Sequence, residues 1–306
     1  MKEIIVGTRG SELALWQAEF IKARLGAVTA TPIRIEVIKT QGDILDQLAF
    51  NKIEGKGFFT KEIEEALLTG QIDLAVHSLK DLMTTMPEGL KLAAVGFRED
   101  SREIVLINKA AYDPDCPLSV GSGAVVGSSS VRRQCQIAES APKLILKDIR
   151  GNVPTRVRKL REGQYDAVIL AYAGVKRLEL DLSDLEAAVL PHEEFLPAPG
   201  QGILAVQTRE NDGAVNPIVS QLDDPEIRLQ ARLERGLLAR FAGGCQLPLG
   251  TYSRIGGKTL TLHAILGRRK DGRWVGLARA SSTGKEPDKV VDDTYRALVS
   301  QQDEYA

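Results

Sequence analysis

Positively charged residues follow five of the predicted strands of this 306-residue chain. In an open α/β sheet, ligands bind beyond the carboxyl ends of the strands, where helix N-termini also offer free amide donors. Cations repeated at these positions predict a site for a ligand with several negative charges. They are Arg9 in VGTRGS, Lys80 in VHSLKD, Arg132 and Arg133 in VGSSSVRR, Arg150 and Arg156 in DIRGNVPTR, and Arg177 in AYAGVKR.

The ligand need not be a nucleotide. The sequence has no GxxxxGK[ST] and no GxGxxG after its first strand. Carboxylates fit the forked donors of arginine equally well. Serines 128–130 open a predicted helix beside two of the arginines, where they either cap the helix or add hydroxyls and amides to an anion site.

Asp81 directly follows Lys80. Its local sequence is compatible with a turn cap. Among several cations, however, a carboxylate stays ionised, and it can then stabilise a transient positive charge on a substrate and relay protons. Lys56, between two glycines in GKGFF, indicates either a plain turn or a mobile flap that closes over a ligand.

The three cysteines, Cys116, Cys135 and Cys245, are an odd number without CxxC spacing, so neither a disulfide framework nor a zinc cage is expected. Cys135 shares helical spacing with apolar residues and is expected to pack in a core, and Cys116 lies in a loop. Composition leaves Cys245, in FAGGCQLPLG, unexplained. The histidines lack metal-site spacing, so no catalytic metal is expected, and His77 is interpreted as a satisfied core histidine.

The composition is that of a globular protein. The 40 basic and 41 acidic residues nearly cancel, which argues against a surface built for nucleic acid or anionic membrane. The N-terminus lacks the features of a signal peptide and no stretch is apolar enough to span a membrane, so we expect a cytoplasmic protein. No sustained heptad pattern is present, which favours a monomer.

Strand and helix signals alternate along the first two thirds of the chain, which indicates α/β architecture. The charged stretch REDSRE, at 98–103, separates two such series. From about residue 224, a long amphipathic helix and alternating strands predict a smaller α+β domain. The segment LPAPGQG, at 196–202, is interpreted as a hinge or crossover.

Seven motifs together closely resemble the porphobilinogen deaminase family, also called hydroxymethylbilane synthases. They run in order from residue 4 to about residue 250: GTRGSELALWQA, GKGFFTKEIE, AVHSLKDL, VGSSSVRRQCQ, RGNVPTR, LPAPGQG and GGCQLPLG. The resemblance implies two α/β domains like those of type II periplasmic binding proteins and a smaller α+β C-terminal domain. The implied divisions are domain 1 at 1–98 and 198–220, domain 2 at 103–194, and domain 3 at 224–306.

The resemblance also implies the reaction: four porphobilinogen molecules are joined head to tail with release of ammonia, and the product is hydrolysed to hydroxymethylbilane. No metal or nucleotide is implied. The implied cofactor is a dipyrromethane primer, held by a thioether to Cys245. Asp81 is the implied catalytic residue.

Further residue roles follow from the resemblance alone. The implied cofactor-binding residues are Cys245, Lys80, Asp81, Ser128, Ser129, Arg132, Arg133 and Arg150. The implied substrate-binding residues are Arg9, Ser11, Lys56, Phe59, Arg150, Arg156, Arg177 and Gln201.

Two other functions stay open from the residues themselves. Two α/β lobes with a basic site could belong to an anion-binding sensor without turnover, since a fold does not determine a function. A cysteine-nucleophile acyl transferase that uses Cys245 with His77 as base is the weaker alternative.

Overall fold

The computed structural model describes residues 2–40, 60–242, 247–270 and 272–303. The chain forms two compact units: residues 1–99 with 202–229, and residues 100–201 with 230–306. Within the described ranges, no helix is both long and apolar enough to cross a membrane.

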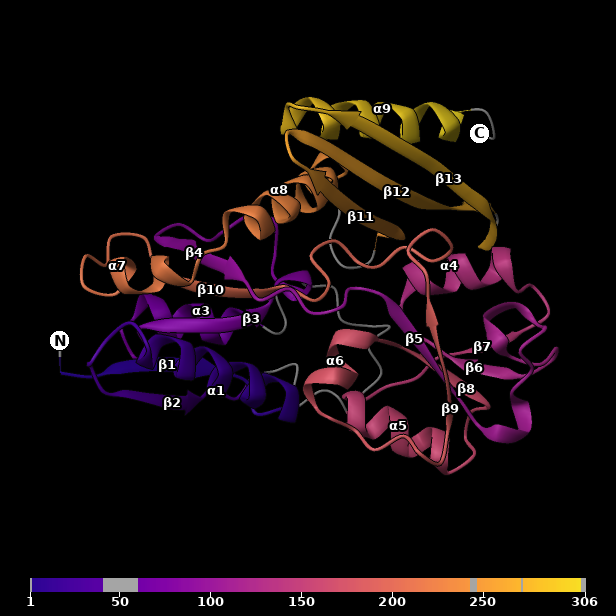
Figure 1. The fold of residues 1–306 in the computed structure, drawn as a ribbon, viewed down its shortest axis with the longest axis horizontal. Helices are drawn as coiled ribbons and strands as arrows, with labels where there is room; N and C mark the ends of the chain where they lie inside the picture. Colours follow the sequence, from indigo (N-terminus) through magenta and orange to yellow (C-terminus); the bar gives the residue numbers. More distant parts are fainter. Residues whose placement is uncertain (1, 41–59, 243–246, 271, 304–306) are drawn as a thin grey trace. The chain divides into compact units, whose positions relative to one another are not determined.

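Unit 1 contains a five-stranded sheet in the order β2-β1-β3-β10-β4 (Figure 1). Strand β1 runs parallel to β2 and β3, whereas β10 runs antiparallel to β3 and β4. The elements of unit 1 are β1 (Ile4–Thr8), α1 (Glu12–Gly26), β2 (Ile33–Val37), α3 (Lys61–Leu68), β3 (Leu74–Ser78), the 3-10 turn η2 (Leu79–Asp81), β4 (Leu90–Gly96), β10 (Leu204–Arg209), α7 (Asn216–Val219) and η5 (Ser220–Leu222).

Both faces of the unit 1 sheet are covered, which explains why its inner strands β1 and β3 are mainly apolar, whereas the edge strand β2 alternates between apolar and charged residues. On one face, Leu74 and Val76 of β3 pack in a core with residues of α1, and on the other, Ala75 packs with residues of α3. Alternate residues of one strand therefore serve two separate cores. His77 shares the α3 side of β3 with Ala75 because the side-chain period of a strand is two.

Unit 2 contains a second five-stranded sheet, in the order β7-β6-β8-β5-β9. It repeats the first arrangement, because β6 is parallel to β7 and β8, and β5 is antiparallel to β8 and β9. Its elements are β5 (Glu103–Ile107), η3 (Lys109–Ala111), η4 (Pro117–Ser119), β6 (Val125–Gly127), α4 (Val131–Ser140), β7 (Ile145–Lys147), α5 (Val153–Arg161), β8 (Ala167–Ala171), α6 (Tyr172–Arg177) and β9 (Glu186–Leu190).

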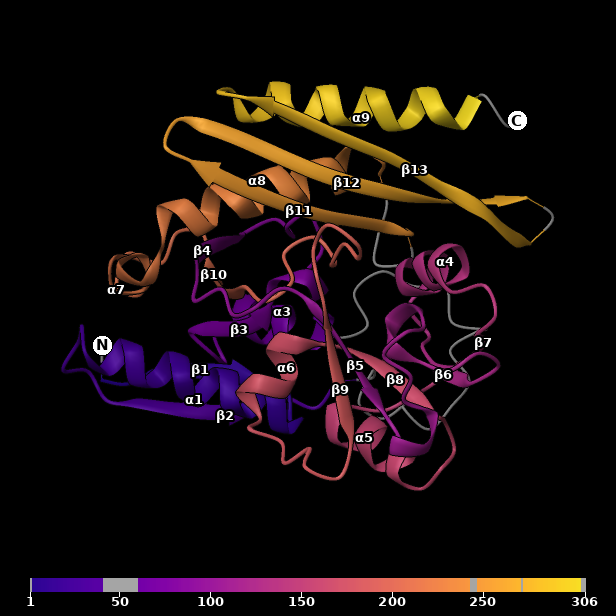
Figure 2. The same ribbon diagram turned by 45° about the vertical axis from the view of Figure 1, so that its right-hand side comes forward.

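Unit 2 also contains an antiparallel three-stranded sheet of β11 (Leu249–Gly256), β12 (Thr259–Lys270) and β13 (Arg273–Gly284). Helix α9 (Pro287–Asp303) lies along β12 and β13 (Figure 2). Helix α8 (Pro225–Arg240) begins in unit 1 and ends in unit 2.

The segments that lead from one unit to the other are hydrogen-bonded to each other. In unit 1, the Glu99 amide donates to the Gly202 carbonyl at 2.9 Å. In unit 2, Gln201 Nε2 donates to the Ser101 carbonyl at 2.8 Å. Gly202 has φ +84, and a Cβ there would lie 2.3 Å from the Glu99 carbonyl oxygen, so this close approach requires glycine.

The predicted fold class is confirmed: two α/β sheets and a smaller α+β part. The charged stretch REDSRE contains the boundary between the two units, between Glu99 and Asp100, as expected. Its last residue, Glu103, begins the buried strand β5, which the sequence interpretation did not include. The charged residue at the strand's start obscured the apolar run behind it.

Candidate active site

A small cavity of about 80 Å³ lies in unit 1 at the carboxyl ends of β1 and β3. These two strands are parallel neighbours, with Gly7 opposite Ala75, so the residues that follow them come out at the same edge of the sheet. The side chains that line the cavity include the predicted site residues Arg9, Ser11 and Asp81, and also Gln17, Thr60, His77 and Ser78.

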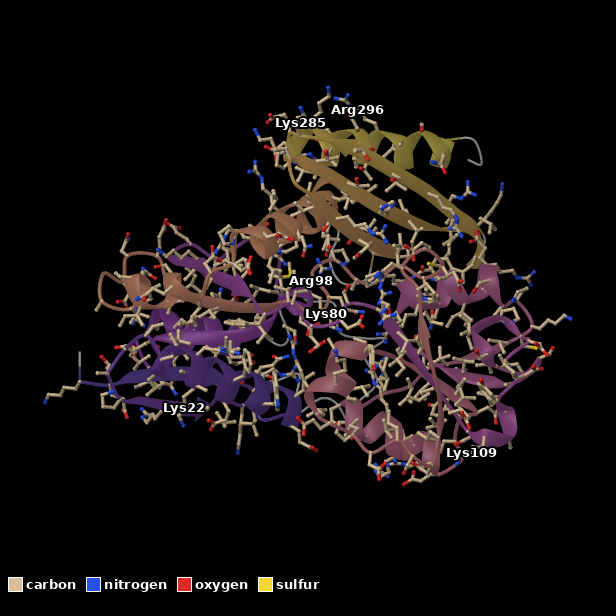
Figure 3. All side chains as sticks on the ribbon, viewed as in Figure 1. Lys22, Lys80, Arg98, Lys109, Lys285 and Arg296 are labelled. Carbon is tan, nitrogen blue, oxygen red and sulfur yellow. The ribbon has the colours of Figure 1, made fainter. Side chains whose placement is uncertain are left out.

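Asp81 is held in the 3-10 turn that follows β3. Leu79, at the start of the turn, is fully buried, and its amide donates to the Ile203 carbonyl at 3.0 Å. Leu82, on the other side, is also buried. These two anchors fix the short segment between them, in which Asp81 is exposed and Lys80, labelled in Figure 3, is half-buried.

The N-terminus of α1 forms one wall of the cavity. The Ser11 hydroxyl accepts a hydrogen bond from the Ala14 amide at 3.3 Å and caps the helix. The buried Gln17 then donates from Nε2 to the Ser78 hydroxyl at 2.8 Å and ties the helix to the end of β3. Sequence reasoning missed both residues of this second bond, because nothing local indicates that they meet.

His77 occupies the floor of the site as a neutral group. Its Nε2 lies 3.1 Å from Gln207 Oε1, and Gln207 Nε2 donates to Glu64 Oε1, also at 3.1 Å. Burial lowers the pKa of His77 to about 4 and raises the pKa of Glu64. The interpretation of His77 as a satisfied core histidine is confirmed.

In unit 2, the predicted serines lie at the start of α4. Ser128 is buried. The Ser129 hydroxyl donates to the Ile149 carbonyl at 2.9 Å and accepts from the Ile149 amide at 3.0 Å, which joins the loops that follow β6 and β7. Ser130 is the N-cap residue, without a side-chain capping bond.

Arg132 and Arg133, in the first turn of α4, are both buried. They share the fully buried carboxylate of Glu103: Arg132 Nη2 donates to Oε1 at 2.6 Å and Arg133 Nη2 to Oε2 at 2.8 Å. Burial lowers the pKa of Arg132, against the opposing effect of Glu103. Sequence reasoning missed Glu103, although a charged residue in an apolar strand is a signal for a buried ion pair.

The other predicted residues of unit 2 lie in the segments that follow β7, β8 and β9. Arg150 is half-buried in the loop after β7, and Arg156 Nε donates to the Gly151 carbonyl at 2.7 Å. Arg177 is buried in α6, and Gln201 is fully buried at the crossover.

Four of the predicted cations, Arg132, Arg133, Arg156 and Arg177, lie in helices rather than in loops. The reason is that helices α4, α5 and α6 start within a few residues of the preceding strand.

Three predicted site residues, Lys56, Phe59 and Cys245, lie outside the described residues. The other two cysteines can be compared. Burial raises the pKa of Cys135 to about 12, and this residue packs against Gly267, as the core interpretation predicted. The Cys116 thiol donates to Asp113 Oδ2 at 3.1 Å, and this bond raises its pKa.

A second cavity, of about 380 Å³, lies within unit 2 between the three-stranded sheet and residues 192–196. Its walls include His192, stacked on Tyr252, and Arg254, which is paired with Glu193. It contains no predicted site residue, so it does not contribute to the site described above.

The two five-stranded sheets define the class of protein. Each has three parallel strands followed by one antiparallel strand and a fifth at the edge, which is the two-lobed plan of type II periplasmic binding proteins. An arginine-specific periplasmic binding protein of Salmonella typhimurium is similar at 11% identity and a TM-score of 0.42, over 75% of this chain and 97% of that chain.

The chain belongs to the porphobilinogen deaminase family. The family model "Porphobilinogen deaminase, dipyromethane cofactor binding domain" matches residues 4–217, and the model of the C-terminal domain matches residues 228–292. A porphobilinogen deaminase of Chlorobaculum parvum is 43% identical over 98% of this chain and 95% of its own length. One of Sulfurimonas denitrificans is 45% identical over 87% of this chain and 84% of its own length.

Proposed function

We propose that this protein is a porphobilinogen deaminase, which condenses four porphobilinogen molecules head to tail, releases one ammonia at each condensation, and hydrolyses the product to hydroxymethylbilane. The observation that carries the proposal is the position of Asp81. In a chain of this family, an exposed carboxylate stands at the carboxyl ends of two parallel strands, in a cavity that it shares with Arg9.

Asp81 is the group proposed to act on the reacting atoms. The bond between the methylene carbon and the protonated amine of the substrate breaks, and the electron pair leaves with ammonia. The methylene is left positively charged, and an ionised carboxylate close by stabilises it. A carbon–carbon bond then forms to the free α-carbon of the terminal pyrrole, and the proton lost from that carbon passes to Asp81.

The cations are proposed to bind the acetate and propionate groups of the pyrroles. Arginine offers two parallel donors that match a carboxylate, and lysine adds a point charge. Unit 1 contributes Arg9 and Lys80, with Ser11 at a helix N-terminus. Unit 2 contributes Ser128, Ser129, Arg132, Arg133, Arg150, Arg156, Arg177 and Gln201. Lys56 and Phe59 are proposed to contact the substrate as well.

The dipyrromethane cofactor of the family is proposed to be attached to Cys245 by a thioether. Reaction at sulfur requires the thiolate, and both described cysteines have raised pKa values, so they are poor attachment points. The donor set of unit 2 suits a carboxylate-bearing group, since the buried Arg133 Nε has no hydrogen-bond partner among the described residues. When bound, the cofactor supplies the pyrrole α-carbon from which the chain grows.

We also propose the three-domain division given above, with boundaries at 1–98 and 198–220, 103–194, and 224–306. The presence of three separate sheets supports it. A monomer located in the cytoplasm completes the proposal, on the resemblance to the family.

Intact-mass spectrometry tests the function and the attachment together. The wild type should carry a permanent adduct of two pyrrole units and consume porphobilinogen, and Cys245→Ala should lose both. Cys116→Ala is the matched control and should keep the adduct. An unmodified wild type without turnover would favour the anion-binding protein instead.

One observation disfavours the acyl transferase. His77 would have to act as its general base, but its pKa of about 4 and its hydrogen bond to Gln207 make it a weak proton acceptor.

A further inference from the structure

Glu103 is a buried carboxylate that has no part in the proposed chemistry. It is the first residue of β5 and is fully buried. Each of its two oxygens accepts a hydrogen bond from a different arginine, Arg132 or Arg133. An isolated carboxylate at this depth would be strongly destabilising, so its presence is tied to these two partners.

The remaining contacts fix both guanidinium groups further. Arg132 Nη1 donates to the Leu196 carbonyl at 2.8 Å, and Arg133 Nη1 donates to the Ile169 carbonyl at 3.0 Å. Each guanidinium is thus held at both of its terminal nitrogens, by the same carboxylate on one side and by a main-chain carbonyl on the other. Two long side chains with many rotamers are confined to one arrangement.

The arrangement leaves donors unused. A guanidinium has five N–H groups, and the bonds described above use two from each arginine. Arg133 Nε is buried without a partner among the described residues. The two arginines and Glu103 together carry one net positive charge. Buried donors with a surplus positive charge suit a carboxylate ligand.

We propose that Glu103 is a positioning residue: it orients Arg132 and Arg133 at the start of α4 so that their remaining donors meet a carboxylate of the pyrrole chain. The inference rests on the proposed function, because it takes the arginines as ligand-binding groups. Glu103 does not touch the ligand and acts only through the two guanidinium groups. It is close in space to both although 29 and 30 residues separate it from them.

Glu103→Gln in the full-length holoenzyme is the primary test. The amide keeps the size of the side chain but replaces one acceptor oxygen with a donor that faces a guanidinium, so at least one arginine loses its partner. We expect KM for porphobilinogen to rise about tenfold, the effect of losing one charge-assisted hydrogen bond, with kcat changed less than about threefold. We also expect the fraction carrying the pyrrole adduct in intact-mass spectra to fall.

A double-mutant cycle separates positioning from general destabilisation. If Glu103 acts through the arginines, adding Glu103→Gln to Arg133→Leu should raise KM by much less than it does in the wild type. Equal effects in the two backgrounds would overturn the proposal. So would a wild-type KM and full adduct occupancy in folded Glu103→Gln.

Two further variants complete the test. Glu139 lies on α4, the helix that carries Arg132 and Arg133, and its carboxylate pairs with Arg279. Glu139→Gln removes this carboxylate and should leave KM unchanged. If Glu103→Gln does not fold, Glu103→Asp keeps the charge but is one methylene shorter, and a KM raised at least threefold supports positioning while a wild-type KM refutes it. A wild type without adduct or turnover would instead refute the proposed function itself.

Discussion

His77 and Gln207 are joined by a buried hydrogen bond, with 3.1 Å between Nε2 and Oε1, across the antiparallel strands β3 and β10. The amide nitrogen of Gln207 donates to Glu64, and this second bond orients the amide so that its oxygen faces His77. An amide oxygen can only accept, so Nε2 of His77 carries the proton. The strand that carries Asp81 at its end is therefore anchored beneath the site by a neutral histidine.

The buried histidine should make stability depend on pH. Its pKa is about 4 in the folded protein and 6.5 as the ordinary value, so the unfolded chain binds more protons between these limits. The contribution of His77 to the free energy of unfolding is complete above pH 6.5. It is lost as the pH falls toward 4, by about 3 kcal/mol in total. Urea unfolding at several pH values measures this.

The matched variant for that measurement is His77→Gln, which cannot titrate. Its free energy of unfolding should vary less between pH 6.5 and 4 than that of the wild type. Glu64 makes a contribution of opposite sign to the pH dependence, because burial raises its pKa and its protonated form favours the fold at lower pH. Since Glu64 is present in both proteins, the comparison between them reports on His77. Equal slopes would show that His77 does not control the pH dependence.

Replacing Asp81 should remove turnover and leave the fold intact. Asp81→Asn keeps the shape but cannot stabilise a positive charge or accept a proton, so kcat should fall about 100-fold to 10,000-fold. Because the side chain is exposed, the melting temperature should change little. Glu88→Gln, an exposed carboxylate in the following segment, is the control. Near-normal turnover in Asp81→Asn would exclude the assigned role.

Arg150→Leu should weaken binding more than it slows chemistry. The residue is half-buried after β7, and its main-chain carbonyl, which the substitution keeps, accepts a hydrogen bond from Lys159 at 3.1 Å. Loss of one carboxylate-binding group should raise KM about tenfold to 100-fold and leave kcat within about threefold. Steady-state kinetics with porphobilinogen decide this, and a fall in kcat at constant KM would contradict it.

Gly202→Ala should destabilise the crossover between the units. The new Cβ would lie 2.3 Å from a main-chain oxygen of Glu99, and φ is +84, so clash and strain together should cost about 2–4 kcal/mol. Gly163→Ala has a similar φ, +71, but open space around the Cβ, and should cost only about 1–2 kcal/mol. Calorimetry should separate the two, and equal losses would show that the clash is relieved.

Local patterns predicted the elements well, because caps and periodicity act over a few residues. The helical signal of residues 11–25, ended by Gly26, predicts α1, and the alternation in residues 33–39 predicts β2, and both elements are present. Strand β5 was missed because a charged residue begins it. Helix α9 was missed because the C-terminal part was predicted only as an α+β domain, without separate bounds for this helix. The motifs of the site were recognised in the sequence. The sequence did not show which polar groups form hydrogen bonds with one another.

The sequence by itself determined which residue types follow the strands, including Asp81 and the cations, because the order of the motifs and the residue types can be read directly from it. Only the tertiary structure decided that Arg132 and Arg133 share Glu103, and that His77 is neutral and bound to Gln207. These relationships join residues 29 to 130 positions apart. Their strength depends on exclusion of water, which arises only when the cores of the two sheets close around them.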